Sequence, residues 1–333
     1  MRILCAVAFC ALLLGAEFVA PVGGTVQDRV LSGAPPSLPR LRWSSGGPEW
    51  VVYPLERLGG RWRFQSDRPC RVSFLARGES YRLLGLFETD LHLAIAATPA
   101  RLSWLGMDEL GRDRFARVIE GTRSSVILSI VALSVAVLSG LLLGAFAGWK
   151  GGFADRGLTM VADMLLALPG LFLLLALRAA LPLLPAPGIE PLLVLAVLCC
   201  GAWIPVARAA QAQARMLREE GFVVAARSCG AGSFWLLRRH LLPGLWPLAR
   251  AQMVPLLPAL IIAEASLAYL GLGLREPAIS LGTLIARVSV AHALQQPWEL
   301  APILALMFVL LLGSWLVSGA RMPRPASWSG ETI

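Results

Sequence analysis

The sequence predicts an all-α protein that crosses a membrane about six times. Of its 333 residues, 56% are hydrophobic and only 15% are charged, whereas an ordinary soluble domain is about 25% charged. The mean hydropathy is +0.67. Several long runs carry no charge, and the basic residues gather between them. This composition excludes a disordered chain, a collagen and a small disulfide scaffold.

The predicted spans follow from the uncharged runs. A helix needs about 20 mostly apolar residues to cross a bilayer. The runs at residues 124–149 and 300–320 contain no charged residue at all. Three further runs lie at residues 158–180, 191–207 and 251–274, with charges only at Asp163, Arg178 and Glu264.

The sixth span is the N-terminal run at residues 3–20, which Glu17 interrupts. The run is short enough to be a cleaved signal peptide instead. Cleavage after Ala20 would place Phe18 where a small residue is required, with Pro21 just after the cut. We therefore expect an uncleaved anchor, and the other five spans keep their orientation in either case.

The distribution of Arg and Lys predicts the orientation of the spans. The short loops on one side carry twelve of these residues, and those on the other side carry three. Because cytoplasmic loops are enriched in positive charge, both termini are predicted to be cytoplasmic. The net charge of +9 thus fits membrane topology better than nucleic-acid binding.

Residues 21–105 form a long segment that the orientation places outside the cytoplasm. Long segments are translocated largely regardless of their charge, so its arginines do not oppose this assignment. Alternating or β-branched residues occur at 51–53, 61–64 and 72–75, and Gly59-Gly60 is a turn signal. We expect a β-rich insert here.

The sequence offers no site for covalent chemistry. A Walker loop needs Lys after Gly, but the single Lys of the chain is Lys150, which follows Trp149. His92, His240 and His292 are scattered, and the six cysteines form no CxxC pair. We therefore predict no catalytic residue, no cofactor and no metal, and an intramembrane protease finds no support.

The loop at residues 211–250 is the most informative part of the sequence. Ala225 and Ala226 remove bulk from a short helix, Gly230 can end that helix in a left-handed conformation, and Pro243 is expected to end a second one. Two interpretations remain open from the residues alone. The unit is either an amphipathic element on anionic lipid or a docking element for a partner.

This loop resembles the signature of the membrane subunits of bacterial ABC importers. The signature reads Glu-Ala-Ala, three residues, Gly, nine residues, Ile-x-Leu-Pro. It falls here on Val224, Ala225, Ala226, Gly230, His240, Leu242 and Pro243. Val stands in place of the usual Glu, and His in place of the usual Ile.

Three other blocks resemble the dipeptide/oligopeptide/nickel branch of that family. The first, at residues 106–123, contains Asp108, Gly111, Arg112 and Asp113. The second is at 163–169, and the third runs from Glu264 to residue 282. The resemblance covers about residues 81–323. The polar ending usual for the sixth span is replaced at residues 313–321, and the outer loop is longer than in the common dipeptide version.

The resemblance implies a type I importer transmembrane domain. It would comprise residues 106–323 with the coupling loop 211–250, preceded by the helix at 1–20 and the segment 21–105 and followed by a cytoplasmic tail at 324–333. The implied function is half of a translocation pathway for peptides or a related small solute in the bacterial inner membrane. The implied partners are a second permease, two ABC ATPase subunits and an extracytoplasmic binding protein.

Asp163 and Glu264 allow an alternative. Charged residues in spans are costly and therefore suggest function. We expect Asp163, near the cytoplasmic end of its span, to have an interfacial or interhelical role. We expect Glu264, in the middle of its span, to face the pathway or the partner permease. An ion-coupled secondary transporter would also use such carboxylates, but it leaves the 40-residue loop 211–250 without a role.

Overall fold

The computed structural model describes residues 16–19, 26–44, 47–83, 87–167, 172, 176, 179, 190–236, 238–239, 242–274, 278–288 and 298–318. These residues divide into two compact units. The first contains residues up to 125 together with 268–307, and the second contains 126–267 together with the residues from 308 onward.

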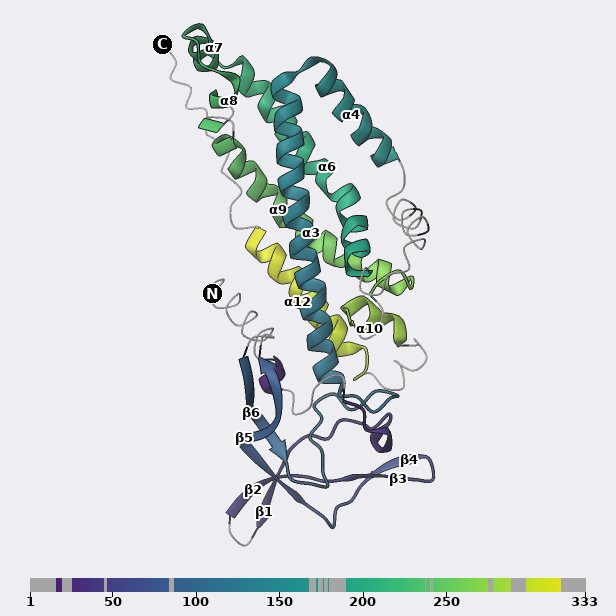
Figure 1. The fold of residues 1–333 in the computed structure, drawn as a ribbon. Helices are drawn as coiled ribbons and strands as arrows, with labels where there is room; N and C mark the ends of the chain where they lie inside the picture. The colour runs from purple at the N-terminus through teal and green to yellow at the C-terminus, as the bar shows by residue number, and fades with distance from the viewer. Residues whose placement is uncertain are drawn as a thin grey trace, which may run out of the picture. The chain divides into compact units, whose positions relative to one another are not determined.

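The first unit is rich in β-structure (Figure 1). A short helix α2 (Ala16–Val19) and a 3-10 turn η1 (Arg29–Leu31) precede the strands. The strands are β1 (Arg40–Ser44), β2 (Gly47–Val52), β3 (Leu55–Leu58), β4 (Arg61–Phe64), β5 (Cys70–Leu83) and β6 (Phe87–Ala96). Four of them form an antiparallel sheet in the order β1-β2-β5-β6, and β3 pairs with β4 in a separate hairpin.

The turn chemistry of the hairpin matches its sequence. Gly59 and Gly60 connect β3 to β4 with φ values of +58° and +82°. A two-residue turn with positive φ at both positions suits the twist of a hairpin, and glycine adopts it without a steric penalty. The three stretches in which the sequence indicated strands overlap β2, β4 and β5. A buried hydrophobic cluster in this unit includes Val52, Cys70 and Leu102.

The helices that follow the strands begin at residue 114. They are α3 (Arg114–Lys150), α4 (Gly152–Ala167), α6 (Glu190–Glu219), α7 (Gly221–Ser228), α8 (Ser233–Leu236), α9 (Leu242–Tyr269), α10 (Leu281–Arg287) and α12 (Ala301–Ser318). Within the described residues, α3, α6 and α9 contain the stretches that are long and apolar enough to cross a membrane. The predicted spans at 124–149 and 191–207 lie inside α3 and α6.

The other predicted spans are described in part. Helix α9 ends at Tyr269, five residues before the predicted limit, and α12 covers residues 301–318. Helix α4 covers the start of the predicted span 158–180, whose remainder lies almost wholly outside the described residues, as does Arg178. Only residues 16–19 of the N-terminal span are described. The count of six spans therefore stays a prediction.

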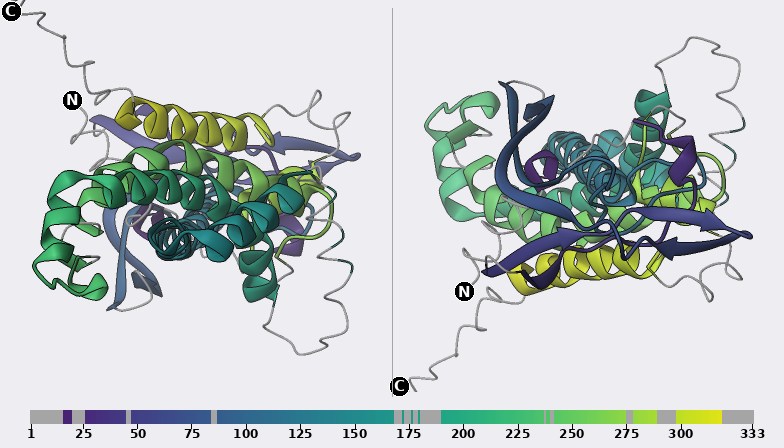
Figure 2. Two further views of the ribbon diagram at one scale, coloured as in Figure 1. Left: turned by 90° about the horizontal axis from the view of Figure 1, so that it is seen from above. Right: turned by 90° about the horizontal axis from the view of Figure 1, so that it is seen from below.

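In the second unit, α3 and α6 lie side by side with their backbones in close contact (Figure 2). Gly140, Gly144 and Gly148 follow one another at intervals of one helical turn along α3. A Cβ atom at Gly140 would lie 2.7 Å from the carbonyl oxygen of Trp203. Equivalent atoms at Gly144 and Gly148 would overlap the backbone of α6. Small residues at such spacing allow membrane helices to approach closely.

Helix α9 completes this packing. Ala145 of α3 and Ala210 and Ala214 of α6 form a buried cluster with Leu245 of α9. A second cluster joins Val137, Val206 and Ala249 from the same three helices. The second unit is therefore held by small and medium-sized apolar side chains between close backbones.

The contact predicts opposite effects for two Gly→Ala substitutions. Gly144→Ala should lower the thermal unfolding midpoint of the detergent-solubilised chain, because overpacking costs about 1–3 kcal/mol. The matched control is Gly201→Ala on α6, where nothing lies within 4 Å of the added Cβ. It should leave the midpoint unchanged or raise it, since Ala favours a helix. Equal midpoints for the two variants would contradict the close contact.

Candidate functional site

The signature loop contains the helix α7, whose end is built as the sequence predicts. Cys229 follows the last helical residue, and Gly230 takes a φ of +86°. The Gly230 N–H donates to the Arg227 carbonyl at 2.9 Å, and the Ala231 N–H donates to the Ala226 carbonyl at 2.9 Å. These two bonds form a Schellman motif, which satisfies carbonyls that the helix end would leave free. The prediction that Gly230 stops the helix is confirmed.

The predicted break at Leu242-Pro243 lies at the start of the helix that contains the next span. Helix α8 ends at Leu236, and Leu242 begins the 28-residue helix α9, with Pro243 in its first turn. Proline suits this position because the first N–H groups of a helix have no intrahelical partner and its φ is already helical. The side chain of Leu242 and all of His240 lie outside the described residues.

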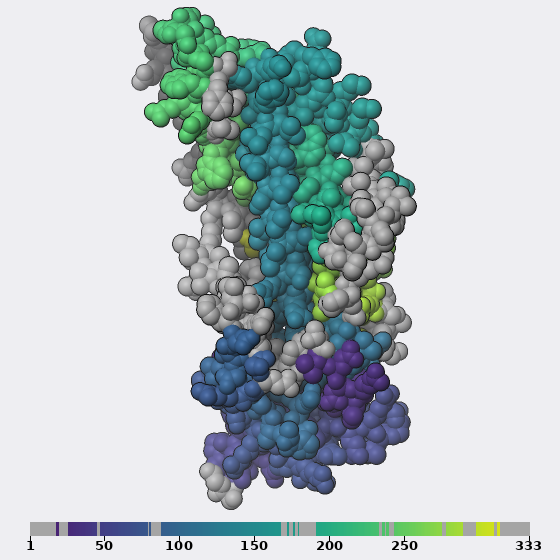
Figure 3. All heavy atoms as spheres, in the orientation of Figure 1, coloured from purple at the N-terminus to yellow at the C-terminus, as the bar shows by residue number. Residues whose placement is uncertain are grey.

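The α7–α8 unit, residues 220–236, has a buried and an exposed side. Val223 and Leu236 are buried at 1% and 0% exposure. Val224 and Ala225 are exposed, and Ala226 is half-buried. The green atoms at one end of the second unit in Figure 3 mark this segment at the surface. The unit therefore presents Val224 and Ala225 to its surroundings, together with the larger Phe222 and Trp235, which are 47% and 53% exposed.

Helix α7 is also attached to the end of α3. The Arg227 guanidinium lies over the ring of Trp149, 4.7 Å from its centre. A cation over an indole face is attracted by the ring quadrupole. Because α7 follows directly on α6, its position is coupled to two of the apolar helices.

Asp163 lies in a polar ladder between α4 and α6. It forms an ion pair with Arg208, and both side chains are partly exposed. Two turns earlier on α4, Asp155 pairs with Arg215 at 2.9 Å and accepts a bond from the Gln211 side chain at 2.7 Å. The structure therefore fits an interhelical role for Asp163.

Glu264 is completely buried, with 0% of its surface exposed. It lies on α9 in the second unit. That Glu264 faces the pathway or the partner permease stays a prediction.

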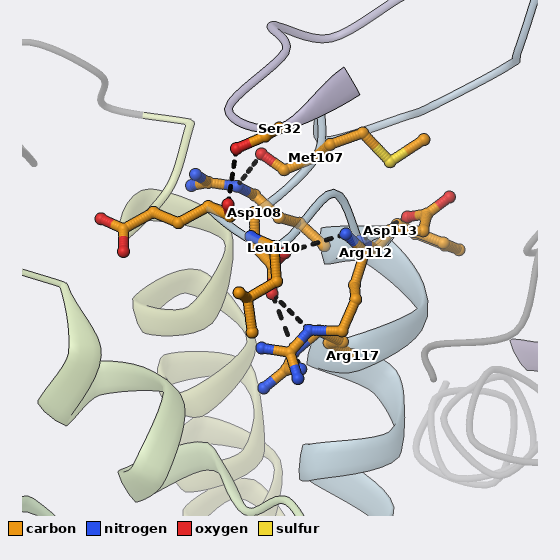
Figure 4. Close-up of polar contacts among 10 residues, drawn as sticks. Ser32, Met107, Asp108, Leu110, Arg112, Asp113 and Arg117 are labelled. Atoms are coloured by element: carbon orange, nitrogen blue, oxygen red, sulfur yellow. Dashed lines mark hydrogen bonds and ion pairs between the residues drawn. The ribbon is translucent and has the colours of Figure 1, made fainter. Parts of the chain in front are cut away.

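The block at residues 106–123 forms a tight polar turn before α3 (Figure 4). Asp108 Oδ1 accepts from the backbone N–H groups of Leu110 and Arg112 at 2.9 and 2.8 Å. Its Oδ2 pairs with Arg112 at 2.7 Å and faces Arg117 at 3.6 Å. The side chains of Arg112 and Arg117 are only 8% and 4% exposed. A single carboxylate thus fixes the turn and compensates two buried cations.

The same turn anchors the beginning of the β-rich segment. The Asp28 N–H donates to the Gly111 carbonyl at 3.0 Å, and the Gly33 N–H donates to the Asp108 carbonyl at 2.8 Å. Gly111 has a φ of +75°, and a Cβ atom there would overlap the carbonyl of Asp28. Glycine at position 111 is therefore required both for backbone conformation and for space.

Two blocks that are far apart in the sequence meet in the first unit. The Leu281 N–H donates to Ser125 Oγ at 3.0 Å. A Cβ atom at Gly121 would lie 3.1 Å from the carbonyl carbon of Ser280. Arg114 also forms an ion pair with Glu299, which sequence reasoning missed because the two residues share no local pattern.

Asp113 caps the start of α3 from a buried position. Its Oδ1 accepts from the N–H groups of Phe115 and Ala116 at 2.8 and 3.3 Å. Its Oδ2 is buried without a hydrogen-bond partner among the described residues. Burial raises the pKa of Asp113 from 3.8 to about 7, against the lowering effect of the two backbone N–H groups.

The raised pKa of Asp113 predicts a pH dependence of stability. The folded chain holds this proton more tightly than the unfolded chain. The resulting stabilisation is complete below pH 3.8 and is lost as the pH rises through about 7. Each unit of pKa shift corresponds to about 1.4 kcal/mol. The thermal unfolding midpoint, measured in detergent, should therefore fall with a measurable slope between pH 5 and about 8.

Asp113→Asn should flatten that slope, because asparagine keeps the cap but does not titrate. The matched control is Asp67→Asn, at an exposed position in a turn, which should keep the slope of the unmodified chain. An unchanged slope in Asp113→Asn would show that another group titrates.

Among the residues that the structure describes, no cluster of three His, Cys, Asp or Glu side chains could hold a metal ion.

Comparison with solved structures finds a limited likeness. A chain from "Inward facing conformations of the MetNI methionine ABC transporter" aligns with a TM-score of 0.49 and 17% identity, over 61% of this chain and 93% of that one.

Several curated proteins are similar in sequence. The oligopeptide transport system permease protein OppC of Bacillus subtilis is 32% identical over 61% of this chain and 64% of its own length. The dipeptide transport system permease protein DppC of Bacillus subtilis is 33% identical over 56% of each chain. This chain therefore spans less than two thirds of the length of these two relatives. A putative peptide permease protein of Brucella ovis is 32% identical over 69% of this chain and 74% of its own length.

The model of one protein family, described as "Binding-protein-dependent transport system inner membrane component", matches residues 140–321. This region contains the signature loop, the polar ladder and Glu264, and it makes up more than half of the sequence. The chain belongs to the family of binding-protein-dependent transport system inner membrane components.

Proposed function

We propose that the chain is a membrane-spanning permease subunit of an ATP-driven importer and forms half of a translocation pathway for peptides or a related small solute. Family membership supports the transport role. The names of the relatives, which are oligopeptide, dipeptide and putative peptide permeases, support the solute class. The long apolar helices α3, α6 and α9 support a membrane-spanning subunit.

The observation that carries the proposal is the geometry of the α7–α8 unit. A short helix with an exposed, small-residue side is fixed by a Schellman end at Gly230. It is also coupled to α3 through Arg227 and Trp149. A partner surface can approach Val224 and Ala225 closely, and a displacement of α7 would be transmitted to α3 and α6. We infer that separate ATPase subunits dock here.

The chain itself would not hydrolyse ATP. Lys150, its single Lys, is the last residue of α3, and its Nζ lies 5.6 Å from the ring centre of Phe146. A phosphate-binding Lys instead follows glycine in a loop between a strand and a helix. Two ATPase subunits would provide the energy, and a second permease would complete the pathway.

The proposed arrangement has six spans, a type I importer domain and both termini in the cytoplasm. The β-rich segment would then lie outside the cytoplasm, where a solute-binding protein could deliver its cargo. The basic loops next to α6 and α9 support this orientation. The Asp108 turn would hold the segment at the outer end of α3.

The first test is the end of α7. Gly230→Val places a β-branched residue at a φ of +86°, which costs roughly 1–2 kcal/mol. In the reconstituted importer, ATP hydrolysis should persist while solute uptake per ATP falls at least about tenfold, a factor that corresponds to about 1.4 kcal/mol.

The matched control for that test is Gly232→Val, two residues later. Its φ is not in the left-handed region, and nothing lies within 4 Å of the added Cβ. This variant should transport normally. Normal uptake by Gly230→Val as well would contradict a coupling role for the helix end.

A second test addresses docking itself. Ala225→Trp adds bulk to the exposed side of α7 without disturbing the buried Val223, and it should prevent the ATPase subunits from co-purifying with the permease. Ala212→Trp changes an exposed alanine of α6 outside the unit and should leave co-purification intact. Retention of the ATPases by Ala225→Trp would place their contact elsewhere.

A further inference from the structure

A second feature includes Trp235 at the end of the α7–α8 unit and the start of α9. An open groove of about 480 Å³ is lined by Trp235, Arg238, Arg239 and Pro243. All four side chains are exposed. Neither arginine has an ion-pair partner among the described residues. Two guanidinium groups and an indole therefore surround a space that a small anionic group can enter.

The position of the groove relates it to the membrane. Pro243 is the first residue of the candidate span Pro243–Tyr269, so the groove lies where α9 would leave the bilayer. A helix of 27 residues is about 40 Å long, whereas the hydrocarbon core is about 30 Å thick. The first turns of α9 therefore fall at the level of the lipid headgroups.

The exposed face of α9 continues from the groove. Trp246 and Arg250 follow Pro243 by three and seven residues, so the three positions share one side of the helix. Trp246 is 54% exposed, and Arg250 is also exposed. Helix side chains lean toward the N-terminus, which directs Arg250 back toward the groove. Tryptophan is typical of the membrane interface, and basic pockets beside spans suit anionic headgroups.

We propose that this groove binds the phosphate headgroup of an anionic phospholipid. Arg238 and Arg239 donate to the phosphate oxygens, because a guanidinium matches phosphate geometry with two parallel bonds. Trp235 and Trp246 contact the glycerol region. The site is separate from the small-residue side of α7, and the proposal holds whatever solute the importer carries.

An acidic protein surface is the competing occupant. Two observations favour lipid. The groove lies at Pro243, the first residue of a candidate span, and the exposed Trp246 and Arg250 continue from it along that span. A protein partner that occupied only the groove would leave Trp246 and Arg250 of α9 exposed.

The test is native mass spectrometry of the purified full chain in detergent. Phosphatidylglycerol and phosphatidylcholine with identical acyl chains are added in separate titrations. The unmodified chain should retain phosphatidylglycerol in preference to phosphatidylcholine. Arg238→Gln/Arg239→Gln should weaken retention of phosphatidylglycerol at least about tenfold, because both charge-assisted donors to the phosphate are lost.

The control is Lys150→Gln/Arg156→Gln, which removes two positive charges on the same side of the spans but outside the groove. It should bind phosphatidylglycerol like the unmodified chain. Should the groove double variant fail to fold, the single variants Arg238→Gln and Arg239→Gln carry the same test, because both side chains are exposed.

Three results would overturn the proposal. Equal loss in both double variants would indicate a general charge effect. Displacement of the lipid by millimolar inorganic phosphate would assign the groove to free phosphate. Undiminished phosphatidylglycerol binding in Arg238→Gln/Arg239→Gln, with loss of the co-purifying ATPases, would assign the groove to the protein interface.

Discussion

The backbone contact between α3 and α6 is the constraint on which the second unit depends. Inside a bilayer, apolar side chains gain little by leaving lipid for one another, so helix association relies on close packing and on bonds between polar groups. Gly140, Gly144 and Gly148 permit this approach by leaving room for the carbonyl groups of α6. The polar ladder then fixes α4 against the same helix. Helix α6 is thus the common partner of both neighbours, and α7 continues directly from its end.

Much of the helical architecture could be predicted from hydropathy. The uncharged run at 124–149 lies within α3, because an apolar run of that length satisfies its backbone groups best as a helix. The break at Gly230 was also predictable, since few residues other than glycine adopt its conformation. A break at Leu242-Pro243 was predictable as well, but the start of α9 at this point was not, because proline both follows helices and begins them.

The long-range polar pairs could not be predicted. Arg114 and Glu299 are far apart in the chain, and nothing near either residue identifies the other. The sequence gives only a weak indication of the polar ladder. Asp155 and Asp163 are two turns apart on α4, and Arg208 and Arg215 are similarly spaced on α6. Recognising it requires knowing that the two helices pack together. The burial of Asp113 likewise depends on neighbours that only the folded chain supplies, and the groove at Arg238 exists only once α9 begins at Leu242.

The bonds from Asp28 to Gly111 and from Gly33 to Asp108 have an evolutionary consequence. They hold the two ends of the intervening segment next to each other, so that this segment forms a closed loop. Its ends stay together whatever its length, and insertions or deletions within it need not disturb the helix that follows. Lengthening such a closed segment costs little conformational entropy. A β-rich segment of very different size can therefore be carried on an unchanged helical scaffold.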